Sequence, residues 1–440
     1  VSLNRLVSVL SACSAGPLTH ETRLAESSRA SESIFAQGQK GPPVRKREGV
    51  CPEERETSDT ELTQRKRGDQ VNQMRGRKAE AHRLPLRGRP PLARTPKNTM
   101  RVAMYYNNRD VRLQAMPVPA IGPGELLVRV RASGICGTDV MEWYRIQKAP
   151  LVLGHEIAGE IVGVGKGVGD YRVGNRVFVS HHVPCMSCRY CLSGHHSVCD
   201  TLRRTHFDPG GFAEYIRVPK INVELGTFLL PEEISFEEGS FIEPVGCVVR
   251  AQRFARLHVG QTVLVIGSGL SGLLHVQMAR VHDAARVVAT DINDFRLKAA
   301  REFGADTVIH AAEDVPARLR EVNDGRLADL VIVCAGAMPA IQQGVRSVER
   351  GGTILFFAPT AAGVEVPIPL FELWRDEVTI ATSYAASPQD ITEAIEMIRS
   401  RRVRVREMIT HRLSLAEAGH GFQLVATAQD SIKVIIEPQR

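Results

Sequence analysis

The stretch VLVIGSGLSGLLHV, residues 263–276, decides the fold of half of this chain. An apolar run is followed by Gly267, Gly269 and Gly272 in the pattern G-x-G-x-x-G, and a helix-like segment follows. The first glycine allows a tight turn, the second lets the backbone approach a pyrophosphate, and the third lets helix and strand pack closely. The helix N-terminus then faces the phosphates. The motif predicts a dinucleotide-binding turn. The alternative is a glycine turn in a flavodoxin-like sheet without a dinucleotide.

An acidic residue after the next strand supports the dinucleotide interpretation. The segment RVVATD ends at Asp291, about twenty residues beyond the glycines, where a carboxylate can bind a ribose 2′-hydroxyl. Such a carboxylate repels a 2′-phosphate, so NAD is favoured over NADP, although Arg296 keeps NADP as an alternative. We expect six cofactor-binding residues: Gly267, Gly269, Leu270, Gly272, Asp291 and Arg296.

The pattern of apolar residues divides the chain from residue 100 onward. Residues 100–245 alternate apolar and polar positions between Pro and Gly, which predicts short antiparallel strands. Residues 246–384 alternate continuous apolar strands with amphipathic helices, which predicts a doubly wound parallel sheet. Residues 385–440 carry one predicted helix, 387–400, and strand-like segments at 406–414 and 431–438.

The net charge of +7 resides entirely in the first hundred residues. Residues 1–99 hold 19 Lys and Arg against 11 Asp and Glu, whereas the remainder holds 37 against 38. The body of the protein therefore offers no electrostatic footprint for a nucleic acid. Its apolar runs stay below the eighteen residues that a membrane-spanning helix needs.

Residues 1–99 have the composition of a disordered basic extension. Phe35 is their only aromatic residue among Phe, Tyr and Trp, and the segment holds clusters such as VRKRE and QRKRG. We expect Met100 to be the natural start and the extension to lie outside the natural protein. An address tag or a basic interaction arm are the alternatives.

The stretch HHVPCMSCRYCLSGHHSVCD, residues 181–200, predicts a structural zinc site. Its cysteines follow C-x2-C-x2-C-x7-C, and thiolates at these spacings can converge on one tetrahedral zinc whose shell they close. Disulfides are disfavoured because no secretory context exists. An iron–sulfur cluster stays open by spacing alone. The four histidines at 181, 182, 195 and 196 are expected to be bystanders in exposed turns, although the first two end a strand and could lie near a pocket. The expected ligands are Cys185, Cys188, Cys191 and Cys199.

Two smaller motifs in the β region remain for the chemistry. GICGTD contains Cys136 and Thr138, and LGHEIAGEIVGVG contains His155 and Glu156. Taken singly, a cysteine is more often a small buried hydrophobe and a histidine a hydrogen-bonded core residue. Their combination with the zinc motif and the glycine turn is what carries information.

These motifs together resemble the zinc-dependent medium-chain dehydrogenase/reductase family, the alcohol, sorbitol and threonine dehydrogenase group. GHE with Gly159 and Gly165, the four-cysteine segment, GGFAEYIRVP, IEP and GSGLSG occur in family order, and the resemblance covers residues 100–440. It implies a GroES-like β-rich catalytic domain with an inserted Rossmann domain, and an active site in the cleft between them.

The resemblance also implies a second, catalytic zinc. Cys136 and His155 would be ligands, and Glu243 of FIEPVGC would be the third ligand, as in the polyol dehydrogenase branch, with Glu156 beside the metal. A fourth position would stay open for water or substrate. Zinc acidifies a bound hydroxyl, and the nicotinamide ring accepts a hydride.

The family pattern assigns roles to three further residues and lacks one. Thr138 resembles the relay hydroxyl, and Asp139 would orient His155, with Lys433 near it. Met141 stands where many relatives have the histidine that ends the proton relay. Water, another side chain such as Glu142, or a shorter relay would replace it.

We therefore expect an enzyme that transfers hydride from a polar secondary alcohol, a polyol, cyclitol or amino alcohol, to NAD. The alternatives are a carbonyl reductase acting on a small ketone and a zinc-stabilised nucleotide-binding protein without turnover. We further expect a cytoplasmic homo-oligomer, dimer or tetramer.

Overall fold

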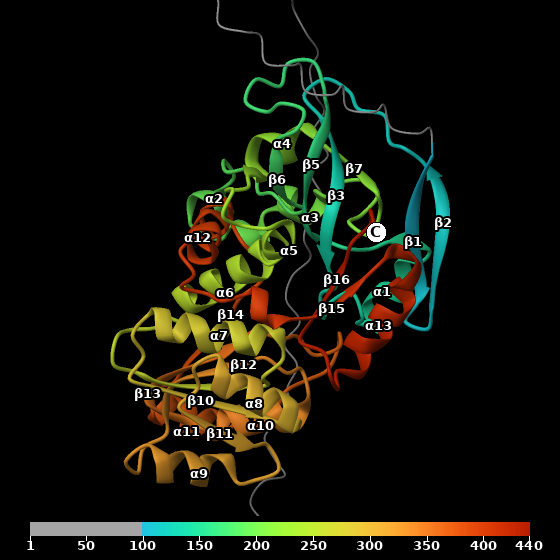
Figure 1. The fold of residues 1–440 in the computed structure, drawn as a ribbon. Helices are drawn as coiled ribbons and strands as arrows, with labels where there is room; N and C mark the ends of the chain where they lie inside the picture. Colours follow the sequence, from blue (N-terminus) through green and yellow to red (C-terminus); the bar gives the residue numbers. More distant parts are fainter. Residues whose placement is uncertain (1–98) are drawn as a thin grey trace, which may run out of the picture. The chain divides into compact units, whose positions relative to one another are not determined.

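A computed structural model describes residues 99–440 (Figure 1). The prediction of a disordered basic extension over residues 1–99 falls outside that range, apart from Thr99, which begins strand β1. Among residues 99–440 no helix combines the length and apolar character needed to cross a membrane.

Two β-sheets form the GroES-like catalytic domain. In a seven-stranded sheet the order is β15-β16-β3-β5-β6-β8, with β7 paired to β3, and every pair is antiparallel except β15 with β16. A three-stranded sheet has the order β2-β1-β4. The strands are β1 (Thr99–Asn107), β2 (Asp110–Pro117), β3 (Leu126–Gly134), β4 (Leu151–Val152), β5 (Glu156–Val164), β6 (Arg176–Ser180), β7 (Tyr215–Val218), β8 (Thr227–Leu229), β15 (Ile409–Leu413) and β16 (Lys433–Ile436).

The predicted alternation corresponds to these strands. In β3 the side chains of Leu126, Val128 and Val130 are fully buried against Ile157 and Ile161 of β5. The C-terminal strand β16 pairs with the end of β3, so that Ile435 lies opposite Gly134. The C-terminal segment thereby returns to the catalytic domain and reaches the residues that follow β3.

Short helices also belong to this domain, and the alternation did not predict them. Those in the connections are α1 (Glu142–Arg145), α2 (Arg189–Leu192), α3 (Asp200–Arg204), α4 (Lys220–Gly226) and α5 (Phe236–Gly239), with α13 (Ala418–Thr427) near the C-terminus. The 3-10 turns are η1 (Ile146–Lys148), η2 (His196–Val198), η3 (Arg406–Met408) and η4 (Leu415–Glu417).

The second domain is a Rossmann fold built on a six-stranded parallel sheet. The order is β11-β10-β9-β12-β13-β14, which reverses direction beside β9. Dinucleotides bind outside the carboxyl ends of strands at such a reversal. The strands are β9 (Thr262–Ile266), β10 (Arg286–Asp291), β11 (Thr307–His310), β12 (Ala328–Val333), β13 (Val348–Phe356) and β14 (Thr379–Thr382).

Helices cover both faces of this sheet, as the continuous apolar strands require. Val263 and Val265 of β9 pack in one cluster of buried residues, and Leu264 and Ile266 pack in another on the opposite face. The first cluster includes residues of α6, α7, α8 and α12, and the second includes residues of α9, α10 and α11. The helices are α6 (Ile242–Phe254), α7 (Leu270–Val281), α8 (Asp294–Glu302), α9 (Val315–Val322), α10 (Met338–Val345), α11 (Leu370–Arg375) and α12 (Pro388–Arg399).

Helix α6 connects the two domains. It packs against α7 and α12, and the boundary that we expect at residue 245 falls inside it. Gly246 allows close packing with α12, because a Cβ there would lie 2.8 Å from Ile391. The first turn of α6 thus carries Glu243 at the junction of the domains, while its buried face joins one cluster with residues of both sheets.

Candidate active site

The four predicted structural ligands converge in the segment that contains α2 and η2. One ligand atom from each of Cys185, Cys188, Cys191 and Cys199 lies within 4.8 Å of the others. The Sγ–Sγ distances are 3.6 Å for Cys188–Cys191 and for Cys185–Cys199. A tetrahedron with zinc–sulfur bonds of about 2.3 Å has edges of about 3.8 Å. The thiols therefore fit one closed zinc shell.

Backbone donors favour the ionised thiols that zinc requires. Cys188 N donates to Cys185 Sγ at 3.3 Å, and Cys185 N donates to Cys199 Sγ at 3.4 Å. A hydrogen bond from Ser187 is the main reason why the pKa of Cys185 falls to about 5. Thiolates bind the metal, so these donors pre-organise the shell.

An arginine of α6 holds this four-cysteine segment against the domain junction. Arg250 is 2% exposed, and its Nη2 atom donates to Gly194 O and to Ser197 Oγ at 3.4 Å each. Its Nη1 atom lies 3.5 Å from Asp390 Oδ2 in α12. The segment is therefore attached to the same helix that carries Glu243.

A second group of possible metal ligands consists of Cys136, His155 and Glu156. One ligand atom from each lies within 4.8 Å of the others. Cys136 follows β3, Glu156 begins β5, and Gly154 adopts φ +95° just before His155. Glu156 is fully buried, its Oε2 atom pairs with Lys433, and its Oε1 atom has no hydrogen-bond partner within residues 99–440. A buried, unpaired carboxylate oxygen beside a thiol and an imidazole fits a zinc ligand.

Glu243 does not belong to that group, which differs from the ligand set that the family pattern suggested. Glu243 is 9% exposed, and its Oε1 atom accepts a hydrogen bond from Cys247 Sγ at 3.5 Å. Burial raises the pKa of Glu243 to about 7. Glu156, and not Glu243, is therefore the carboxylate grouped with Cys136 and His155, while the third zinc ligand remains a prediction.

Asp139 contacts His155, as the sequence predicted. Its Oδ1 atom lies 3.3 Å from His155 Nδ1, and its Oδ2 atom accepts from Cys136 N at 3.1 Å. Burial, the largest single effect, opposes the charged imidazole, but Asp139 and Cys136 together outweigh it and raise the pKa of His155 well above its ordinary value. Asp139 therefore fixes the orientation of the ring. Lys433 pairs with Glu156 and not with Asp139.

The hydroxyl of Thr138 lies between Cys136 and an arginine that the sequence analysis missed. Thr138 Oγ1 donates to Cys136 Sγ at 3.3 Å and accepts from Arg145 Nη2 at 3.3 Å. Arg145 also donates to Thr138 O at 3.0 Å and lies 3.5 Å from Asp139 Oδ1. Glu142, the suggested end of the relay, accepts from Asn108 N instead, at 3.4 Å. The available signal was a basic residue, Arg145, six positions after the GICGTD motif.

His181 and His182 are half-buried and lie near His155, so the expectation of exposed positions is wrong for both. The ring of His181 lies 4.8 Å from that of His155, and the rings of His181 and His182 lie 3.7 Å apart, centre to centre. Both residues are half-buried, and burial lowers the pKa of each, that of His182 to about 3. His195 is exposed, as expected. Because His181 and His182 follow the end of a predicted strand, the sequence had also allowed both to lie near a pocket.

The glycine turn has the geometry that a pyrophosphate requires. Gly267 adopts φ +91°, and a Cβ on Gly272 would collide with Gly267 O. Gly269 precedes α7, which begins at Leu270. Helix and strand approach so closely at Gly272 that only glycine fits, and no side chain caps the N-terminus of α7.

Asp291 and Arg296 lie beside this turn. Asp291 Oδ2 accepts from Ser268 N at 2.7 Å, and Oδ1 accepts from Asn293 N at 2.9 Å. A Cβ on Gly269 would lie 3.6 Å from Arg296 Nη1, and Arg296 Nη2 donates to Ser431 O at 3.4 Å. The Asp291 carboxylate and the Arg296 guanidinium thus both lie beside the glycine turn.

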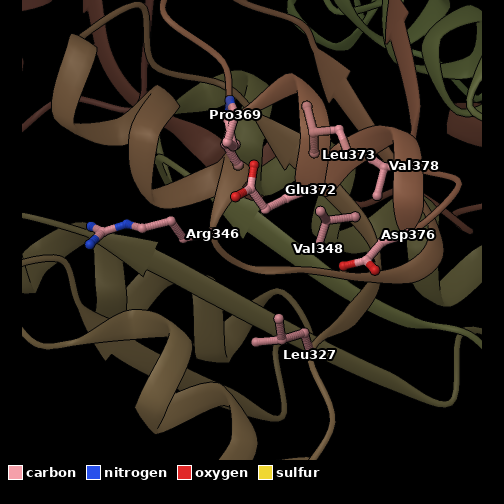
Figure 2. A pocket seen from close by; sticks show the side chains of 9 residues that line it. Leu327, Arg346, Val348, Pro369, Glu372, Leu373, Asp376 and Val378 are labelled. Carbon is pink, nitrogen blue, oxygen red and sulfur yellow. The ribbon is translucent and has the colours of Figure 1, made fainter. Parts of the chain in front are cut away.

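A separate depression of about 250 Å³ lies on the Rossmann domain (Figure 2). It contains none of the predicted site residues. Its lining residues are Leu327, Val345, Arg346, Val348, Pro369, Glu372, Leu373, Asp376 and Val378.

Comparison with known proteins agrees with this geometry. Residues 122–226 match the alcohol dehydrogenase GroES-like domain, and residues 272–400 match the zinc-binding dehydrogenase model. The chain is 33% identical to "Probable D-xylulose reductase A" of Aspergillus terreus over 341 residues, which is 74% of this chain and 95% of the relative. It is 29% identical to sorbitol dehydrogenase of Bacillus subtilis over 360 residues, 79% and 100% of the two chains.

A solved structure is similar over the same region. A zinc-binding dehydrogenase from Sinorhizobium meliloti bound to NADP superposes with a TM-score of 0.70 and 28% identity, covering 78% of this chain and all of the other. The fold and the site define a zinc-dependent dehydrogenase with GroES-like and Rossmann domains. The chain belongs to the zinc-dependent medium-chain dehydrogenase/reductase family, whose cofactors are zinc and NAD(P).

Proposed function

We propose that this enzyme oxidises a polar secondary alcohol, a polyol, cyclitol or amino alcohol, with NAD as hydride acceptor. The observation that carries the proposal is the group of Cys136, His155 and Glu156, with the unpaired Glu156 Oε1 atom and the Thr138 hydroxyl beside it. The names of the relatives, a sorbitol dehydrogenase and a D-xylulose reductase, support a polyhydroxylated substrate. Reduction of the matching ketone is the same reaction in reverse.

We propose Cys136, His155 and Glu156 as the protein ligands of the catalytic zinc, in place of a set containing Glu243. Bound zinc would act as a Lewis acid on the substrate hydroxyl, and bound NAD would accept the hydride. Asp139 holds the His155 ring by its Nδ1 atom, so that Nε2 is the nitrogen available for a metal. Lys433, whose side chain is fully buried like that of Glu156, balances the charge of this carboxylate.

Thr138 Oγ1 is the group proposed to receive the proton of the substrate hydroxyl. Its lone pairs accept from Arg145 Nη2, which holds the hydroxyl in place beside Cys136. A guanidinium does not accept a proton at ordinary pH. The proton therefore leaves Thr138 toward water or a substrate hydroxyl and does not pass through Arg145. This path takes the place of the relay histidine, because residue 141 is a methionine in this chain.

NAD is the proposed nicotinamide cofactor. Asp291 is 6% exposed and stands at the end of β10, where its carboxylate faces the position of a ribose 2′-hydroxyl and repels a 2′-phosphate. The similar dehydrogenase from Sinorhizobium meliloti is bound to NADP, so the preference of this enzyme for NAD requires a direct measurement. The NADP alternative would use Arg296 near the glycine turn.

We propose that the enzyme acts as a homo-oligomer in the cytoplasm. Strand β14 is an edge strand of the described sheet, and Leu370, Phe371 and Trp374 of the neighbouring α11 are 63–73% exposed. An unpaired edge beside exposed apolar side chains is suited to a second copy of this chain. None of the seven cysteines within residues 99–440 forms a disulfide, which suits a reducing compartment. Measuring the molar mass of Trp374→Glu and of wild type by light scattering tests whether β14 and α11 form the interface.

The experiment that tests the function is a screen of zinc-loaded protein for NAD reduction across polyols, cyclitols, amino alcohols and monohydric alcohols. We expect turnover with at least one polyhydroxylated or amino alcohol, and its loss in Cys136→Ser. Absence of turnover with every alcohol in protein that holds zinc and binds NADH would contradict the proposal.

A further inference from the structure

Two adjacent histidines connect the candidate zinc ligands to the Rossmann domain. His181 and His182 follow β6, and the ring of His181 lies 4.8 Å from that of His155. The ring of His182 lies 3.7 Å from that of His181 and 6.3 Å from that of Tyr384, in the segment after β14. The rings form a row that begins at a proposed metal ligand and ends on the cofactor-binding domain.

The backbone that carries this pair is clamped on both sides. Asn222 Nδ2 donates to Ser180 O at 3.0 Å and to His181 O at 3.1 Å, and Ser180 Oγ donates to His182 O at 2.9 Å. Thr205 Oγ1 accepts from Val183 N at 2.9 Å. Side chains on such a fixed segment are presented in one geometry, which is what a recognition site requires.

Neither imidazole ring forms a hydrogen bond with another residue of the described range, 99–440. The Nδ1 atom of His181 is buried and has no hydrogen-bond partner among residues 99–440, and in the same range the ring of His182 makes no hydrogen bond. A buried polar atom left unpaired is unfavourable, so a ligand group that pairs with it gains affinity. Packing alone would be served as well by an apolar ring, since Phe207 already lies 6.4 Å from His181.

We propose that His181 and His182 bind the hydroxyl groups next to the reacting carbinol, and so make this enzyme selective for vicinal polyols over monohydric alcohols. A neutral imidazole offers one donor and one acceptor, which matches a hydroxyl group. A substrate without neighbouring hydroxyls leaves both rings unpaired, and sites built for hydrogen bonds discriminate strongly against such analogues. The inference rests on the proposed function and names its substrate class.

The test uses substrate pairs that differ only in their additional hydroxyls, myo-inositol with cyclohexanol and xylitol with 3-pentanol. His181→Phe and His182→Phe keep a ring but remove the nitrogens. We expect kcat/KM for whichever polyol is turned over to fall about tenfold, while that for the monohydric partner stays within about twofold. His182→Asn, whose amide can hydrogen-bond, should recover part of the loss. His258→Asn, an exposed histidine on the Rossmann domain, is the matched control.

A second readout requires no turnover. The Kd of myo-inositol and of xylitol for the zinc-loaded enzyme–NADH complex, measured by NADH fluorescence, should rise about tenfold in His182→Phe, with zinc content and NADH affinity unchanged. His181 lies against His155, so His181→Phe can lose zinc for that reason alone. In that case the inference is judged from His182→Phe. Equal losses for both members of a substrate pair, or no change for either, would overturn the inference. A wild type that binds polyols but oxidises no alcohol would overturn the proposed function instead.

Discussion

Lys433 Nζ and Glu156 Oε2 form an ion pair in which neither side chain is exposed. The two residues come from β16 and β5, the strands on either side of β3. Gly134 ends β3 between them, opposite Ile435 on one side and Glu156 on the other. A Cβ on Gly134 would collide with both charged groups. The buried charge of the proposed metal ligand thus depends on a glycine and on the C-terminal strand.

Gly134→Ala should therefore separate Glu156 from Lys433. Breaking a buried ion pair costs about 3–5 kcal/mol when one charge is left unpaired, and we expect a loss of about 2–4 kcal/mol in the free energy of unfolding. Zinc should fall from two to one per chain, measured by mass spectrometry after gel filtration. Gly137→Ala is the control, because a Cβ there has nothing within 4 Å. Retention of both zinc ions with wild-type stability would contradict this account.

Chelation should distinguish the two zinc sites. The four-cysteine shell is closed, whereas three protein ligands leave the second metal a position that exchanges with solvent. Brief treatment with a mild chelator should abolish NAD reduction and remove one zinc per chain while the melting temperature changes little. Prolonged treatment should remove the second zinc and unfold the segment 185–199. Simultaneous loss of both metals, or of fold and activity together, would argue against two sites of unequal lability.

Asp291→Ser should narrow the preference for NAD over NADP. The substitution removes a carboxylate that repels a 2′-phosphate and opens the site to Arg296, which lies near the glycine turn. We expect the ratio of kcat/KM values for NAD and NADP to shift toward NADP by about tenfold or more. Asp294→Asn, an exposed residue in the first turn of α8, is the control. A wild type that already prefers NADP would make Arg296 the determinant.

Arg145 is predicted to position Thr138 and Asp139. Arg145→Met removes donors to Thr138 O, Thr138 Oγ1 and Asp139, so turnover should fall about tenfold or more. The Kd of NADH and the zinc content should not change. Lys148→Met, an exposed cation three residues further on, serves as the matched control. An Arg145→Met enzyme with wild-type kcat and an unchanged pH profile would exclude this role.

The sequence predicted the Rossmann domain well because its signals are local. The apolar strand and the three glycines of residues 263–276 correspond to β9 and the start of α7, and residues 387–400 contain α12. Helix α13 was missed, because Gly419 and Gly421 weaken its helical signal and its stability comes from packing. Gly421 lies against Ile135 and Leu413, contacts that no local pattern reveals.

Spacing alone predicted the candidate site only where one motif contained both partners, whereas the contact of Asp139 with His155 was implied by the family resemblance. Cys136 and Thr138 are two residues apart, and the four cysteines lie within fifteen positions, so their spacing was informative. The pairing of Glu156 with Lys433 joins residues 277 positions apart, and the approach of His181 to His155 requires the β5–β6 pairing. These relationships arise from the sheet, which explains why the burial of His181 and the pairing of Lys433 with Glu156 were not predicted.

The third ligand of the catalytic zinc is the last prediction, and three residues compete for the role. Glu156 belongs to the group whose ligand atoms lie within 4.8 Å, whereas Glu243 and Cys247 contact each other at 3.5 Å on α6. Glu156 Oε1 is also the one carboxylate oxygen among the buried atoms that have no hydrogen-bond partner within residues 99–440. We expect Glu156→Gln to lose one zinc per chain and nearly all turnover, and Cys247→Ala to keep both.

Glu243→Gln separates the two carboxylates. If Glu156 is the ligand, Glu243→Gln keeps two zinc ions per chain and changes only turnover, because its carboxyl lies beside the site without entering the shell. Glu156→Gln also leaves Lys433 unpaired, so metal loss could come from a damaged core. The double variant Glu156→Gln/Lys433→Met removes that charge: if it folds with wild-type stability and still holds one zinc, the loss is one of coordination. Loss of zinc in Glu243→Gln with retention in Glu156→Gln would restore Glu243 as the ligand, because the metal would then follow the carboxylate of α6 and not that of β5.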